Sequence, residues 1–115
     1  MNAYIADTYA WFRYLEGGDY KELLEDNEIE TPSIVLAELT RVLLKKNVSP
    51  ALVERIQQFI QKNSLVLQLD AKAAVKAGGK SVAEGLSLTD AIIYSYASEE
   101  KPLLTGDKHF RGNRT

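Results

Sequence analysis

The sequence contains no cysteine, and only seven glycines and three prolines occur among its 115 residues. The absence of cysteine excludes a disulfide scaffold, a thiolate zinc site, an iron–sulfur cluster and a cysteine nucleophile. The small share of glycine and proline, without runs of one residue type, excludes a disordered or collagen-like chain. We therefore expect residues 1–115 to fold as one domain, and a reducing cytoplasm fits the composition.

Long apolar runs are also missing. The first apolar stretch, MNAYIADTYAWF, is interrupted by Asp7 and has no basic leader. This pattern argues against both a signal peptide and a membrane-spanning helix. We therefore expect a cytoplasmic protein without a membrane partner.

The overall charge is small but unevenly distributed. The formal net charge is −2, yet residues 1–30 carry eight acids against two bases, and residues 41–80 carry eight bases against two acids. A basic patch able to meet phosphates is compatible with this distribution, as is a set of solvated surface lysines. The net charge therefore does not exclude a nucleic-acid substrate.

Short apolar segments alternate with helical patterns along the chain. Strands are predicted at 3–6, 28–31, 65–69 and 102–105, and helices at 8–16, 19–27, 33–46, 50–62, 70–77 and from 87 onward. The segments 3–6 and 65–69 have the composition of buried strands. Such alternation builds a parallel sheet covered by helices on both faces. The expected fold is a three-layer α/β/α domain with a parallel sheet of about four strands.

Several local signals mark helix ends. Asp19 with Glu22, and Ser87 with Asp90, have the spacing of capping boxes at helix starts. The pair Gly78-Gly79 is expected to end or bend the preceding helix.

Acidic residues stand at positions that are typical of chemistry in such folds. Asp7 and Asp107 each follow an apolar strand, at the edge where parallel sheets bind ligands. Each acid also has a structural interpretation: Asp7 and Asp90 as helix caps, Glu38 as a partner of Arg41, and Asp107 as a turn residue. The only histidine, His109, is expected to be a surface turn residue and is given no role.

Four segments together carry a family resemblance: YIADTYAWFRYL, TPSIVLAEL, LSLTDAIIYSYA and LLTGDKHF. In this order and spacing they resemble the signature segments of the PIN domain family, particularly the VapC-like toxin ribonucleases, over residues 3–110. The resemblance implies four carboxylates that bind metal and act in catalysis, and two supporting hydroxyls. These residues are Asp7, Glu38, Asp90 and Asp107, with Thr8 and Thr105.

The family's chemistry explains why carboxylates would converge. Two carboxylates about 5 Å apart repel by roughly 3 kcal/mol at an effective dielectric constant of 20, so a converging set holds protons or binds a cation. Oxygen ligands favour Mg²⁺ or Mn²⁺ over zinc. The resemblance thus implies a metal-dependent endoribonuclease that hydrolyses RNA phosphodiester bonds, the toxin of a toxin–antitoxin pair. Arg13 is a candidate phosphate contact, although an arginine among aromatic residues commonly covers apolar surface.

Partners are indicated by the helix that follows Asp7. Its side chains are apolar on nearly every side, more than one core-facing stripe requires, which predicts an interface. A homodimer or a partner segment would cover it, and the resemblance implies an antitoxin near this region. The residues concerned are Tyr9, Trp11, Phe12, Tyr14 and Leu15.

One departure from the family leaves alternatives open. No apolar residue follows Phe110, where family members continue into a further strand, so the sheet could lack its last edge strand. This departure suggests a catalytically inactive PIN-like module that binds RNA or protein. A receiver-type phosphotransfer domain is a weaker alternative, because Thr8 and Tyr9 follow Asp7 where receivers need a second acid. A haloacid-dehalogenase-like phosphatase is weaker still, because Tyr9 replaces its second aspartate.

Overall fold

A parallel sheet of four strands organises the chain. The computed structural model describes residues 2–18 and 20–104. The strands are β1 (Ala3–Ala6), β2 (Glu28–Pro32), β3 (Leu65–Leu67) and β4 (Leu103–Leu104). They lie in the order β3-β2-β1-β4, and every neighbouring pair is parallel. Because β1 lies inside the sheet, the residue that follows it sits between two neighbouring strands.

Six helices are described. They are α1 (Thr8–Gly17), α2 (Lys21–Asp26), α3 (Ser33–Lys45), α4 (Pro50–Asn63), α5 (Ala71–Glu84) and α6 (Leu88–Tyr94). None of these helices is both long and apolar enough to cross a membrane.

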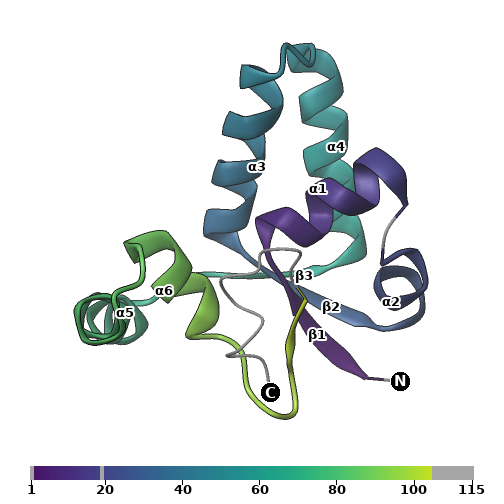
Figure 1. Ribbon diagram of the computed structural model, residues 1–115. Helices are drawn as coiled ribbons and strands as arrows, with labels where there is room; N and C mark the ends of the chain where they lie inside the picture. Colours follow the sequence, from purple (N-terminus) through teal and green to yellow (C-terminus); the bar gives the residue numbers. More distant parts are fainter. Residues whose placement is uncertain (1, 19, 105–115) are drawn as a thin grey trace.

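The connections between strands place the helices in two layers. The chain steps from β1 to β2 and from β2 to β3 in one direction, and then returns past both strands to β4. Because parallel crossovers are right-handed, the helices of the return connection lie on the opposite face of the sheet. Figure 1 shows α1, α3 and α4 together above the strands, with α5 and α6 as a separate pair. The predicted three-layer α/β/α fold is confirmed.

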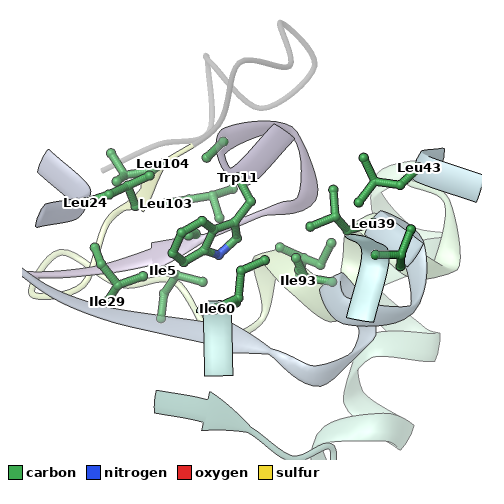
Figure 2. Packing of buried hydrophobic residues seen from close by; sticks show 14 residues of the cluster. Ile5, Trp11, Leu24, Ile29, Leu39, Leu43, Ile60, Ile93, Leu103 and Leu104 are labelled. Carbon is green, nitrogen blue, oxygen red and sulfur yellow. The ribbon is translucent and has the colours of Figure 1, made fainter. Parts of the chain in front are cut away.

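The main hydrophobic core joins the sheet to both groups of helices. Figure 2 shows the indole of Trp11 in the middle of this cluster, which also contains Ile5 of β1, Ile60 of α4 and Ile93 of α6. All four side chains are at most 2% exposed. Burial of such side chains stabilises the fold by about 1.5–3 kcal/mol each. These residues fix the helices against the strands that end at the candidate site.

A chain of hydrogen bonds runs through this core. Trp11 Nε1 donates to Thr31 Oγ1 at 3.1 Å, and Thr31 Oγ1 donates to Ser64 Oγ at 2.9 Å. Ser64 Oγ then donates to the carbonyl oxygen of Ile60 at 2.7 Å. This core hydrogen-bond chain joins α1, β2 and the end of α4, and each hydroxyl or indole hydrogen in it has an acceptor.

An ion pair connects the beginning of β4 to β2. Successive strand residues point to opposite faces, so Glu30 points away from the helices that Thr31 meets. Lys101 Nζ lies 2.7 Å from Glu30 Oε2, and this hydrogen bond together with the negative charge raises the pKa of Lys101. The pair therefore links the segment before β4 to β2, across the intervening strand β1.

Two predicted boundaries are wrong. Instead of a buried strand at 65–69, β3 has three residues at the edge of the sheet, and Leu65 is 61% exposed. The composition of residues 65–69 could not reveal this edge position. Among the described strands, β3 pairs with β2 alone. The pair Gly78-Gly79 does not end α5, which continues to Glu84 because buried Ala77 and α6 hold it in place. The helix ends at Gly85, whose φ of 68° suits glycine.

Of the two predicted capping boxes, only the one at Ser87 lies within the described residues. Ser87 is the N-cap of α6, and its Oγ accepts the backbone N–H of Asp90 at 3.1 Å. Asp19 lies outside the described residues, and α2 begins after Tyr20, which makes no side-chain cap bond.

Candidate active site

Asp7 stands at the junction of β1 and α1. Its backbone N–H donates to the carbonyl oxygen of Leu104 at 3.3 Å, which continues the pairing of β1 with β4. Its carboxylate Oδ1 accepts the N–H of Ala10 at 2.8 Å and so caps α1. The residue is only 4% exposed. Strand pairing and helix capping together fix this carboxylate at the carboxyl edge of the sheet.

Glu38 reaches the same region from α3. The helix buries Val35, Leu39 and Leu43, and Glu38 lies half-buried beside that apolar face. Its Oε1 accepts a hydrogen bond of 2.6 Å from the hydroxyl of Thr8. In the described part of the chain Glu38 forms no ion pair, so Arg41 does not neutralise it. The glutamate is therefore oriented by a neutral hydroxyl.

Asp90 comes from the first turn of α6. The Ser87 cap fixes the start of this helix, and the buried residues Ala91, Ile92 and Ile93 hold it against its neighbours. Contacts between α6 and α3 bring Asp90 towards the helix that carries Glu38. Local capping and tertiary packing thus both determine the position of this half-buried carboxylate.

The three acids line one cavity of about 180 Å³, which we call the carboxylate pocket. Its lining comes from α1, α3, α6 and the end of β1. The lining residues are Asp7, Thr8, Tyr9, Glu38, Val42, Asp90 and Ile93.

The remaining predicted residues are not part of this lining. Asp107 and Thr105 lie outside the described residues, as does His109. Arg13 is exposed on α1 and is not among the residues that line the pocket. The structure thus brings together Asp7, Thr8, Glu38 and Asp90 from the predicted set.

Three pocket residues were not predicted from the sequence. Val42 and Ile93 follow Glu38 and Asp90 by four and three residues, so they share a helix face with the acids. Tyr9 is 46% exposed at the pocket, although the sequence indicated only a contribution to an interface. The spacing from each acid could have identified Val42 and Ile93, whereas the exposure of Tyr9 depends on the tertiary packing.

The donors in the pocket fit a hard cation. All are carboxylate or hydroxyl oxygens, the ligand type of Mg²⁺ and Mn²⁺. Within residues 2–18 and 20–104, no three acidic or histidine side chains are close enough to form a complete protein ligand set. Mg²⁺ does not need one, because it keeps several waters and takes one or two carboxylates. Among the described residues, Asp7, Glu38 and Asp90 are those from which such an ion would take one or two carboxylates.

The sheet, its two helical layers and the carboxylates at its carboxyl edge define an α/β protein with a candidate metal site. The family model for the PIN domain matches residues 4–114. The chain therefore belongs to the PIN domain family, which confirms the resemblance and sets aside the receiver and phosphatase alternatives. PIN domains are generally nucleases that use divalent metal ions.

A solved structure supports the same fold. The chain is similar to a chain in the crystal structure of VapBC2 from Rickettsia felis bound to a DNA fragment from their promoter. The TM-score is 0.70 with 20% sequence identity, and the match covers 96% of this chain and 92% of that one. No curated protein matches the sequence.

Proposed function

We propose that this protein is a metal-dependent endoribonuclease, the toxin of a toxin–antitoxin pair. The observation that carries the proposal is the convergence of Asp7, Glu38 and Asp90, from three separate elements, on one pocket of a PIN domain. Carboxylates that line the same cavity repel one another to a degree that a bound cation or protons would offset. The arrangement therefore favours a metal-binding active site over a structural role for all three acids.

The residues of the chain have distinct tasks in this proposal. Asp7, Glu38 and Asp90, with Asp107 as the fourth acid, hold Mg²⁺ or Mn²⁺. When bound, such an ion lowers the pKa of a water molecule and offsets charge on the phosphodiester during hydrolysis.

Two kinds of contact position these acids. Thr8 holds Glu38 Oε1 through its 2.6 Å hydrogen bond, and the α1 cap holds Asp7 Oδ1. We assign Thr105 a supporting hydroxyl and Arg13 a phosphate contact.

The toxin assignment and its partners rest on a separate argument. The fold matches a chain of a VapBC2 complex, and an antitoxin partner and a cytoplasmic location follow from that likeness as proposals. A homodimer was predicted from the aromatic helix. In the structure Trp11 belongs to the chain's own core, whereas Tyr9 is exposed. The homodimer therefore stays a proposal, and the structure assigns none of these aromatic residues to its interface.

The test is cleavage of an end-labelled RNA pool by the purified protein with Mg²⁺, Mn²⁺ or EDTA. We expect cleavage with metal only, and a loss of about a hundredfold or more in Asp7→Asn. Asparagine caps a helix as well as aspartate does, so this variant should unfold at the same temperature as the wild type. Cleavage that persists in EDTA or in Asp7→Asn would contradict the proposal. A folded wild type that cuts no RNA would favour the inactive binding module.

A further inference from the structure

We propose that one unpaired base of the RNA substrate stacks on Tyr9, and that the adjoining phosphates are bound by Arg41 and Lys45 of α3 and by Lys46, which follows this helix. This inference rests on the proposed nuclease function and assigns substrate contacts to residues outside the acidic set. We call the three cations the basic strip. The argument follows from their place relative to the carboxylate pocket.

One face of α3 carries the pocket residues Glu38 and Val42 together with Lys45 of the basic strip. Glu38 and Val42 line the pocket, and Lys45 follows Val42 on the same side of the helix. The seven residues from Glu38 to Lys45 correspond to about 10 Å along the helix axis. An extended strand whose reacting phosphate lies at the pocket can therefore bring a neighbouring phosphate to Lys45.

Helix α1 forms the other side of the proposed RNA-binding track, which runs from the carboxylate pocket to the basic strip. Near the start of α1, Thr8 contacts Glu38, and farther along Lys46 Nζ lies 5.5 Å from the centre of the Phe12 ring. The two helices therefore run alongside each other from the pocket to Lys46. Tyr9 lies on α1 between these two contacts, at the pocket itself.

The charges along the track are arranged in two blocks. Glu38 is the only acid in α3, and the basic strip lies entirely on the carboxyl-terminal side of it. All three cations are exposed, and none forms an ion pair with a described residue. They are therefore available to phosphates, whereas the carboxylates repel phosphates unless a metal ion is bound.

Tyr9 indicates why the strand would be single-stranded. It is 46% exposed, and no described residue accepts or donates a hydrogen bond at its hydroxyl. Exposed aromatic rings beside a basic groove stack on unpaired bases, whose faces are free. Bases within a duplex already stack on one another and cannot present a face to Tyr9. The combination of an aromatic ring and a basic strip thus favours RNA loops or ends as substrate.

The test measures binding without cleavage. A fluorescently labelled single-stranded RNA of mixed sequence and a hairpin duplex are titrated with the protein in EDTA and in Ca²⁺ over a series of salt concentrations. We expect Tyr9→Ala to weaken binding of the single strand by about 5- to 150-fold, with no change for the duplex. Tyr9→Phe should bind nearly as the wild type does, because it keeps the ring.

The contribution of the basic strip is measured by the salt dependence of RNA affinity, and a matched control variant is available. Each of Arg41→Gln, Lys45→Gln and Lys46→Gln should reduce the slope of log affinity against log salt by about 1. Lys21→Gln on α2 removes the same charge from an exposed site that does not line the pocket and should leave the slope unchanged. Thermal unfolding of every variant checks that the fold is intact.

The outcomes separate this proposal from the proposed function. Wild-type binding with the expected losses supports the track even if the protein cuts no RNA with Mn²⁺. The track is overturned if the wild type binds neither RNA, if Tyr9→Ala binds the single strand as tightly as the wild type, or if Lys21→Gln matches the basic-strip variants. A protein that cuts RNA but shows any of these results keeps the nuclease function without this track.

Discussion

Two groups of polar side chains contact α1, and they differ in charge: one group is neutral and hydrogen-bonded, and the other consists of carboxylates. In the core hydrogen-bond chain, the Trp11 indole and the Thr31 and Ser64 hydroxyls are neutral, and each hydrogen finds an acceptor. In the carboxylate pocket, like charges from β1, α3 and α6 share one cavity. Matched neutral partners stabilise the fold, whereas like charges that are brought together oppose it. The contrast separates the polar residues that have neutral hydrogen-bond partners in the core from the carboxylates of the candidate site.

The largest effect should come from Glu38→Gln. We expect a loss of RNA cleavage of about a hundredfold or more, because a carboxylate of the metal site is removed. The free energy of unfolding without metal should stay the same or rise, because glutamine still accepts the Thr8 hydrogen bond and repels no carboxylate. Cleavage assays and urea unfolding measure the two quantities. A clear loss of unfolding free energy in Glu38→Gln would contradict the contrast between the core hydrogen-bond chain and the carboxylate pocket, since Glu38 would then act as a structural residue.

A smaller effect, on stability alone, is expected for Thr31→Val. The side chain is fully buried, and valine leaves the Trp11 indole N–H without an acceptor. The expected cost is about 1–3 kcal/mol of unfolding free energy, with cleavage by the folded protein unchanged. Thr89→Val is the matched control, because the Thr89 hydroxyl makes no hydrogen bond to a described residue. Equal unfolding curves for the two variants would show that the core hydrogen-bond chain contributes little.

The smallest effect is expected in α5, which belongs neither to the core hydrogen-bond chain nor to the carboxylate pocket. Gly79 lies inside α5, where an added Cβ would meet no atom within 4 Å. We expect Gly79→Ala to raise the unfolding free energy by about 0.5–1 kcal/mol, because alanine favours the helix. Gly85→Ala, at a φ of 68°, should instead lower it. Unfolding measurements that reverse these signs would contradict the boundaries of α5.

Local signals account for most of what the sequence predicted about the fold. The strand before Asp7, the helix it caps and the Ser87 cap each depend on neighbouring residues, and the structure confirms all three. The errors occurred where distant residues decide. Gly78-Gly79 stays helical because tertiary packing holds α5, and β3 is exposed because the strand order places it at an edge.

The candidate site was predicted less directly. No local pattern shows that Asp7, Glu38 and Asp90 meet, because β1, α3 and α6 are far apart in the sequence; the family resemblance supplied their association. The hydrogen bond from Thr8 to Glu38 likewise depends on how α1 packs against α3. Asp107 and Thr105 stay predictions, since they lie outside the described residues.

The hydrogen bond from Asp7 to Leu104 has a consequence for the order of folding. It joins residues from the two ends of the described chain, and such long-range pairings form late because a large loop must close first. A ribosome releases Asp7 early and Leu104 only after nearly a hundred further residues have been added. The pairing of β1 with β4, which anchors Asp7 at the carboxyl edge of the sheet, therefore cannot form before Leu104 has left the ribosome.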